Sequence, residues 1–337
     1  MKSEERKRIF YLDFIRIMAC MMVILQHAPM PGLGTSSVFL SATSFLTYPG
    51  IGLFFMVSGA LLLPVRQPSE DFYKRRLTKV TIPAVLWMLF YLILGYALHK
   101  YSLSELVKSI LLIPLMPSMV PVFWFIYVLI GLYLFAPVIS PWLEKASKKE
   151  FKFYFILWGI TLFIPILNGY LNITYGYYSI LCYFGGYLGY FIMGFYLHHF
   201  NKNNSYSSIL LLTGVPILVY ALCKYCHMKE NFNTYYYLSV FSVSMAIGWF
   251  LLLKKVFENM NLDGKLRNWT INLSNACFGI YLVHLFFIRN VLWNIDWLTS
   301  YGGIFQIVVT TILTLTFSYL TTFLLSKLPF SKYLIGY

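Results

Sequence analysis

Long apolar segments constrain this chain more than any other feature of its sequence. Of its 337 residues, 59% are hydrophobic and only 11% are charged, whereas soluble globular domains carry about 25% charged residues. A bilayer core about 30 Å thick requires about 20 apolar residues for each crossing helix. Segments of this kind recur along the chain, and the period-two alternation of a membrane barrel is absent. We expect about ten spans, near residues 9–27, 44–64, 80–98, 121–140, 152–168, 179–198, 207–222, 235–253, 271–290 and 303–326.

The fold class predicted by this pattern is an all-α polytopic membrane protein, a single domain over 1–337 with its helices around a central cavity. Lys and Arg gather in every second connection, which is typical of cytoplasmic loops. Both termini are therefore expected in the cytoplasm. We expect the N-terminal segment to be retained, because Asp13 and Arg16 interrupt the apolar run that a signal peptide would need. The net charge of +14 is explained by this bias of Lys and Arg toward cytoplasmic loops and by the attraction of such loops to anionic lipids. We therefore expect no nucleic-acid partner.

The first span, YLDFIRIMACMMVILQH, contains an acid, a base and a histidine. At about 100° per residue, Arg16 and His27 point the same way on one helix and lie about 16 Å apart along it. Asp13 is placed to pair with Arg16 one turn away. Ionisable residues within a membrane usually face a bundle interior or a watery cavity, which makes these three residues candidates for a functional site. The alternative is a helix that starts near the membrane surface, with Asp13 and Arg16 reaching toward the headgroups and His27 already outside the membrane.

A basic triplet, Lys74, Arg75 and Arg76, is expected in the loop before the third span. Guanidinium groups bind phosphate oxygens in pairs, so these side chains could hold a polyphosphate at the cytoplasmic mouth. The bias of cations toward cytoplasmic loops also explains some of them.

Further candidate residues occur on two later spans. Trp124 and Tyr127 share a face of the fourth span, and either line a site or anchor the helix at the interface. His284 lies well inside the ninth span, which runs in the same direction as the first. It could therefore approach the depth of His27, either as a functional residue or as a hydrogen-bonded packing residue.

The five cysteines form no evident disulfide framework. Cys223, Cys226 and His227 match the C-x-x-C-H pattern of c-type haem attachment, in a segment expected outside the membrane. The pattern is short, and haem would also require a second axial ligand, so we do not expect a haem cofactor.

Five motifs follow one another along the chain: YLDFIRIMACMMVILQH, GLFFMVSGALLL, FYKRRLTKVTIP, WFIYVLIGLYL and GIYLVH. This ordered set resembles the acyltransferase 3 family of bacterial membrane acyltransferases over nearly the whole chain. The resemblance implies a multi-pass enzyme of the bacterial cytoplasmic membrane. Such an enzyme would move an acyl group, commonly acetyl, from cytoplasmic acyl-CoA to a hydroxyl of a cell-surface or lipid-linked glycan.

The resemblance also implies site residues. The arginine and histidine of the family's first helix map onto Arg16 and His27, and its basic pair or triplet maps onto residues 74–76, where Lys74 replaces a frequent arginine. Tyr281 and His284 of GIYLVH join Trp124 and Tyr127 as substrate-binding candidates. Acyl-CoA would be a substrate, with no tightly bound cofactor and no metal. Glycan and membrane lipid are the other expected partners, and a homo-oligomer is a candidate state.

A mechanism follows as a hypothesis. His27 would take the proton of the acceptor hydroxyl and pass it to the leaving thiolate, because imidazole titrates near working pH. Arg16, oriented by Asp13, would position the donor or stabilise the oxyanion. The competing class is a glycan or lipid-linked sugar transporter or flippase, which would favour internal repeats and broken helices. No repeat between the halves is evident, and the acceptor and the acyl chain stay open.

Overall fold

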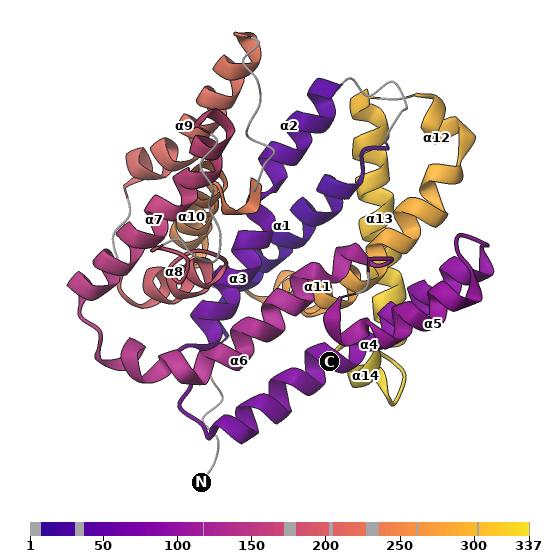
Figure 1. Cartoon of the computed structure of the whole chain (residues 1–337), viewed down its shortest axis with the longest axis horizontal. Coiled ribbons are helices and arrows are strands. Elements are labelled where there is room, and N and C mark those ends of the chain that lie inside the picture. The colour runs from indigo at the N-terminus through magenta and orange to yellow at the C-terminus, as the bar shows by residue number, and fades with distance from the viewer. Residues whose placement is uncertain are drawn as a thin grey trace.

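The computed structural model describes residues 8–30, 37–116, 118–171, 180–201, 205–226, 236–260, 262–301 and 303–336. Every regular element in these ranges is a helix (Figure 1). The α-helices are α1 (Phe10–His27), α2 (Ser37–Thr47), α3 (Pro49–Leu62), α4 (Ser69–Ala97), α5 (Leu103–Leu111), α6 (Trp124–Lys145), α7 (Lys148–Leu171), α8 (Leu188–His199), α9 (Tyr206–Tyr225), α10 (Val240–Phe257), α11 (Gly264–Asn290), α12 (Asp296–Ser300), α13 (Gly303–Leu325) and α14 (Ser331–Ile335). The short 3-10 turns are η1 (Ile113–Leu115), η2 (Pro121–Phe123), η4 (Tyr236–Leu238) and η5 (Leu292–Asn294).

Nine helical segments within the described ranges are long and apolar enough to cross a membrane. They correspond to nine of the expected spans, and the second combines α2 and α3 across the bend at Pro49. The chain is an all-α polytopic membrane protein, as its apolar segments predict. The spans run Phe10–His27, Ser41–Leu62, Ser69–Ala97, Pro121–Lys145, Lys148–Leu167, Tyr206–Tyr225, Val240–Phe257, Gly264–Asn294 and Gly303–Leu325.

The tenth expected span, 179–198, contains the short helix α8 instead of a full crossing helix. Its 12 residues extend only about 18 Å. Residues 180–187, which precede α8, form turns, and the indole Nε1 of Trp158 on α7 donates to the carbonyl of Gly186 at 3.0 Å. Non-helical backbone is tolerated at membrane depth only where protein surrounds it. The segment therefore does not form one continuous crossing helix.

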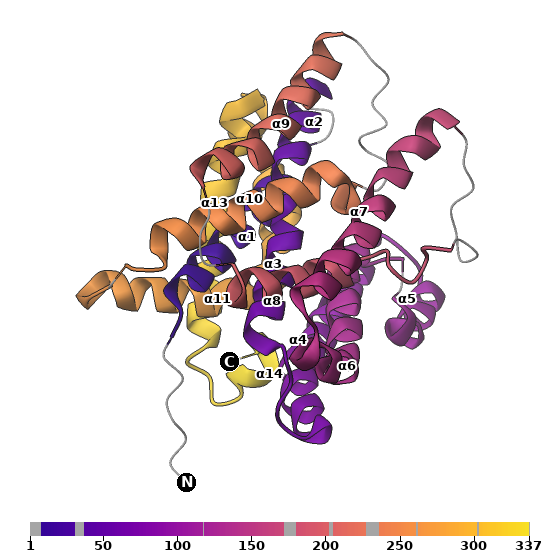
Figure 2. The same cartoon turned by 90° about the vertical axis from the view of Figure 1, so that its left-hand side faces the viewer.

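Small residues allow α8 to cross α3 with the two backbones in contact (Figure 2). A Cβ added at Gly59 of α3 would lie 1.8 Å from the carbonyl oxygen of Phe191, and one at Gly194 of α8 would lie 1.9 Å from that of Met56. Close approach through small residues is a common way to pack helices in membranes, where helix association gains little from hydrophobic burial. The short helix is thereby held in the middle of the bundle.

A buried lysine holds the end of α8. The amine of Lys254 on α10 donates to the carbonyls of Leu197 at 2.8 Å, His198 at 3.2 Å and Asn201 at 2.7 Å. Carbonyls at the end of a helix lack partners within the helix, and a cation there also complements the helix dipole. The His198 ring in turn hydrogen-bonds with the hydroxyl of Tyr11, which fixes α8 against the first turn of α1.

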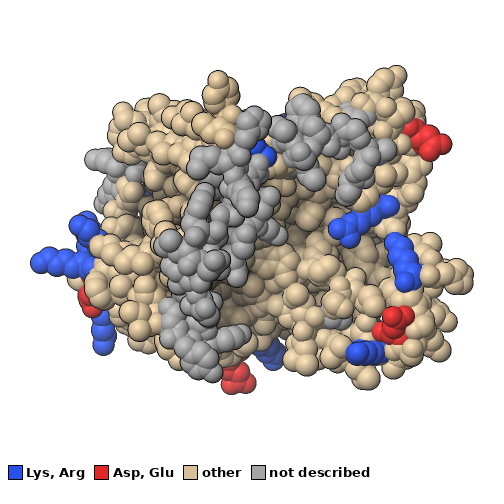
Figure 3. All heavy atoms as spheres, turned by 45° about the horizontal axis from the view of Figure 1, so that its top comes forward, with Lys and Arg blue, Asp and Glu red and all other residues tan. Residues whose placement is uncertain are grey.

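Helix α1 occupies the interior of the bundle and packs against α3, α10, α11 and α13 (Figure 1). In the apolar part of helix α9, by contrast, only 11% of the residues are buried inside the protein, so most of its surface is left for lipid. In Figure 3, the coloured side chains of Lys, Arg, Asp and Glu are few and scattered over a largely uncharged face. The polar residues of α1 therefore lie within the bundle, and the face seen in Figure 3 carries few charged side chains.

Candidate active site

The carboxylate of Asp13 is the centre of a buried charge network near the start of α1. Arg8 donates to both of its oxygens, from Nε at 2.7 Å and from Nη2 at 2.9 Å, and Ser274 of α11 donates to Oδ1 at 2.6 Å. Arg8 also donates to the side-chain oxygen of Asn275 at 3.1 Å. Asp13 is 5% exposed, and a buried carboxylate needs such paired, charge-assisted contacts. The network joins α1 to α11.

The expected pair of Asp13 with Arg16 is present, but it is the weaker of two ion pairs. Arg16 Nη1 lies 3.9 Å from Asp13 Oδ1, beyond hydrogen-bond distance, and donates instead to Ser274 Oγ at 3.1 Å. The hydrogen-bonded partner is Arg8, which the sequence analysis does not single out as a site residue. Ser274 therefore orients Arg16 and contacts Asp13 at the same time.

The basic triplet lies on a helix and not in a loop, which corrects the expectation from sequence. Helix α4 starts at Ser69 and continues through the triplet without interruption. The apolar pattern predicts that this helix starts near residue 80, because the charged first turns of α4 resemble a loop in composition. Lys74 and Arg75 are exposed, whereas Arg76 is half-buried.

A buried tyrosine lies within electrostatic range of both Arg76 and Arg16. The hydroxyl of Tyr133 on α6 shares a hydrogen bond with Ser58 of α3 and interacts electrostatically with both arginines. Tyr133 lies within the fourth motif, but the spacing of that motif does not assign it a role.

At the other end of α1, two imidazoles face each other. The ring of His27 lies 5.5 Å from the ring of His284, measured between centroids. The Nδ1 atom of His284 is 2.6 Å from the carbonyl oxygen of Tyr281, and since a carbonyl only accepts, Nδ1 carries the proton. Nε2 of His284 is buried, without a hydrogen-bond partner in the ranges described. Arg289, five residues further along α11, interacts electrostatically with both rings.

Trp124 lies beside aromatic rings of the bundle at this end of α1. Its ring is 5.4 Å from that of Tyr187 and 5.0 Å from that of Tyr237. The side-chain amide of Gln26, next to His27 in the chain, donates to the Tyr237 hydroxyl at 2.7 Å. Trp124 is therefore coupled to the histidine end of α1, which favours a site role over membrane anchoring alone.

Two other substrate-binding candidates use their hydroxyls within the protein. The hydroxyl of Tyr127 donates to the carbonyl of Ile113, and that of Tyr281 donates to the carbonyl of Val122 at 2.8 Å. Both bonds hold the segment between α5 and α6. These tyrosines support the site by fixing the segment that leads to Trp124.

The cysteine motif gains no support as a cofactor site. Cys223 lies in the last turn of α9, Cys226 follows its end, and both are free thiols. His227 lies outside the described residues. Within the described ranges, no group of three or more His, Cys, Asp or Glu side chains could hold a metal ion.

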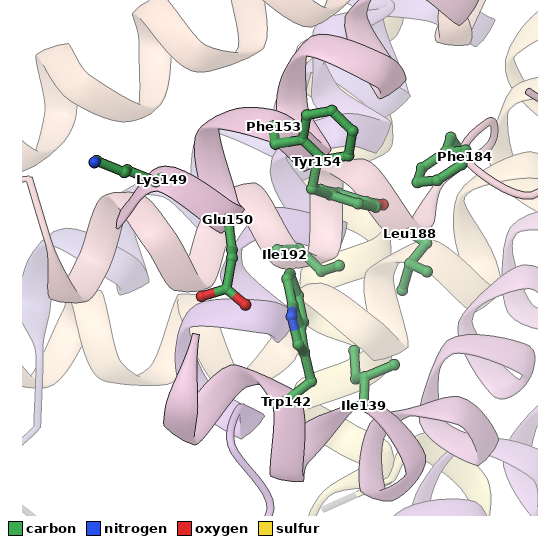
Figure 4. Close-up of a pocket in the computed structure, with 9 residues that line it drawn as sticks. All are labelled: Ile139, Trp142, Lys149, Glu150, Phe153, Tyr154, Phe184, Leu188 and Ile192. Carbon is green, nitrogen blue, oxygen red and sulfur yellow. The ribbon is translucent and has the colours of Figure 1, made fainter. Parts of the chain in front are cut away.

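A pocket of about 620 Å³ lies away from these residues, between α6, α7 and α8 (Figure 4). Its lining is almost entirely apolar. It contains none of the predicted site residues, so the expected central cavity stays a prediction.

The fold and site define a multi-pass membrane protein with polar residues enclosed along one central helix. A family model described as an acyltransferase domain matches residues 9–323, nearly the whole chain. The chain belongs to this family and is a membrane acyltransferase. No curated protein and no solved structure matches it.

Proposed function

We propose that this acyltransferase moves an acyl group, in the first instance acetyl, from cytoplasmic acyl-CoA to a hydroxyl of a cell-surface or lipid-linked glycan. The membrane would be the bacterial cytoplasmic membrane. The observation that carries the proposal is the pairing of His27 with His284, because a buried, unpaired imidazole nitrogen beside a second imidazole is suited to proton transfer.

In the proposed step, His27 is the general base. It removes the proton of the acceptor hydroxyl as that oxygen attacks the thioester carbonyl, and the C–S bond of the resulting tetrahedral intermediate then breaks. His27 then gives this proton to the leaving sulfur, so that CoA departs as a free thiol and His27 returns to its neutral form. In the reacting complex, Nε2 of His284, which has no partner among the described residues, would accept a hydrogen bond from the His27 ring and so fix the tautomer of the base.

The donor would enter at the basic end of α1. Arg76, with the exposed Lys74 and Arg75, binds the CoA phosphates, since guanidinium groups match phosphate oxygens. Arg16 lies about 16 Å along α1 from His27, which favours a role in positioning the donor arm over stabilising an oxyanion at the histidine. Arg289 is the cation near the imidazoles, and we propose that it stabilises the oxyanion.

The acceptor would bind at the histidine end, against the aromatic rings of Trp124 and Tyr237. An aromatic face and nearby polar groups such as the Gln26 amide suit a ligand with apolar and hydroxyl-bearing surfaces.

The test uses purified protein in nanodiscs with acetyl-, succinyl- and longer acyl-CoA compared side by side. Saturable donor binding, with free thiol released when a glycan acceptor is added, would support the proposal. Folded protein that binds no acyl-CoA and releases no thiol would overturn it, and glycan movement without thiol release would instead indicate a transporter.

A further inference from the structure

The pocket between α6, α7 and α8 opens at the outer surface of two membrane-spanning helices. The large side chains beside it face outward: Phe153 is 63% exposed, Val138 is 65% exposed and Ile156 is 51% exposed. In a bilayer these positions contact lipid, so hydrocarbon chains are the medium at the mouth of the pocket. The inner lining comes from Ile139, Trp142, Tyr154, Phe184, Leu188 and Ile192.

An apolar space of this size does not favour water. Buried waters need two to four polar partners, and cavities lined by aliphatic and aromatic groups stay dry. A volume of about 620 Å³ left empty would forfeit many dispersion contacts. A hydrocarbon chain from the surrounding bilayer supplies those contacts.

One polar atom in the lining indicates more than hydrocarbon. The hydroxyl of Tyr154 is buried and has no hydrogen-bond partner among the described residues. Figure 4 shows it pointing from α7 toward Phe184 and Leu188 across the pocket. A phenol buried without a partner is costly, which favours a ligand with an acceptor oxygen at this depth. The hydroxyl has almost no accessible surface as it stands, so the ligand oxygen reaches it only when the side chains over it move aside.

The rim of the pocket carries one cation and one carboxylate, with further lysines near it in the chain. It includes Lys149, in the first turn of α7, whose amine points away from the cavity (Figure 4). The carboxylate of Glu150, also at the rim, accepts from the backbone N–H and hydroxyl of Ser147, at 2.7 Å each, and so caps the helix. Lys145, Lys148 and Lys152 lie on the same helix ends, which suits a phosphate headgroup.

We propose that this pocket binds one acyl chain of an anionic phospholipid, with the Tyr154 hydroxyl donating to an ester carbonyl and the headgroup beside the lysines. A glycerophospholipid has an ester carbonyl between its phosphate and its hydrocarbon, which is the order found from rim to interior. An isoprenoid chain offers no such acceptor. The bound lipid would wedge α6, α7 and α8 together.

The experiment uses the full chain in nanodiscs of phosphatidylglycerol and phosphatidylethanolamine. A fraction of the phosphatidylglycerol carries a photoactivatable diazirine on one acyl chain, and cross-linked peptides are mapped by mass spectrometry. We expect labelling at Trp142, Tyr154 and Ile192 to exceed that at the exposed lipid-facing position Ile312 of α13.

Two variants sharpen the result. Ile192→Trp fills the pocket and should abolish labelling at Trp142, with labelling at Ile312 unchanged. Tyr154→Phe keeps the apolar volume and should lower labelling about fivefold, the factor for one hydrogen bond of about 1 kcal/mol.

Two results would overturn the proposal. One is labelling in the pocket no stronger than at Ile312, which would indicate only annular lipid. The other is labelling that Tyr154→Phe leaves unchanged. Equal labelling by an isoprenoid diazirine probe would also contradict the ester contact. None of these outcomes depends on acyl transfer, so the proposed function is tested separately.

Discussion

The imidazole of His27, the last residue of α1, lies 5.5 Å from that of His284 on α11, with the two ring planes inclined by 39°. His284 is 1% exposed and is held through Nδ1 by the carbonyl of Tyr281. A fixed imidazole with a free acceptor nitrogen therefore stands beside an imidazole at a helix end. We therefore propose His27 as the base and His284 as the residue that positions it.

Replacing His27 by alanine should lower kcat by about 10²- to 10⁴-fold, the usual contribution of general base catalysis. Donor affinity should be unchanged, because Arg16, at the proposed donor end of α1, is about 16 Å away along the helix. Thiol release and acyl-CoA binding are the measurements. His99→Ala, at an exposed histidine after α4, is the matched control and should retain activity. Substantial activity in the His27 variant would remove it from the base role.

Replacing His284 by phenylalanine keeps a ring in the space but removes the acceptor nitrogen. We expect kcat to fall about tenfold, on the scale of one lost buried hydrogen bond, with KM for the donor unchanged. The measurements are kcat, KM for the donor and the apparent Tm. A packing defect would lower the apparent Tm, whereas loss of a positioning contact would lower kcat alone. Full activity in this variant would exclude His284 as a positioning residue.

Arg76→Ala should raise the donor Kd about tenfold or more, because a half-buried guanidinium makes stronger phosphate contacts than an exposed one. Arg75→Ala should have a smaller effect. Titration with acyl-CoA measures both. Arg66→Ala is the control, since Arg66 has a 77% exposed side chain and forms only a surface pair with Glu144 at 3.7 Å. Equal donor affinities in all three variants would show that the triplet does not bind the donor and reflects only the bias of cations toward cytoplasmic loops.

Arg8→Ala should lower stability by about 2 kcal/mol, the scale of charge-assisted hydrogen bonds to a buried carboxylate. The measurement is the free energy of unfolding in detergent. The double variant with Asp13→Asn should lose less than the two single changes combined, because the uncompensated charge is gone. Strict additivity would show that Arg8 and Asp13 do not interact in the folded protein.

Gly59→Ala should disrupt the crossing of α3 and α8, since its Cβ would lie 1.8 Å from a backbone oxygen that cannot move aside cheaply. Lower yield of folded protein and a lower apparent Tm are expected. Gly131→Ala is the matched control on α6, where an added Cβ meets nothing within 4 Å among the described atoms. There the higher helix propensity of alanine should stabilise by up to about 1 kcal/mol. Similar losses from both changes would refute a specific role for the crossing.

Much of the fold follows from the sequence because membrane crossing is a local property. A run of about 20 apolar residues must satisfy its own backbone and therefore forms a helix. The pairing of Asp13 with Arg16 also follows from spacing within one helix. The common depth of His27 and His284 follows from the direction of their spans, and the ring contact confirms it.

Packing between helices decided the rest. Helical spacing does not show that Arg8 is the main partner of Asp13, because Arg8 precedes the first residue of α1 and its position is not set by the helix. Nor does it show that Ser274 contacts both Asp13 and Arg16, because these contacts join segments far apart in the chain. The short length of α8 could not be predicted either, since an apolar run does not reveal whether lipid or protein surrounds it. The sequence by itself determined a membrane bundle with charged residues on its first helix. Only the tertiary structure determined which distant side chains those charges meet.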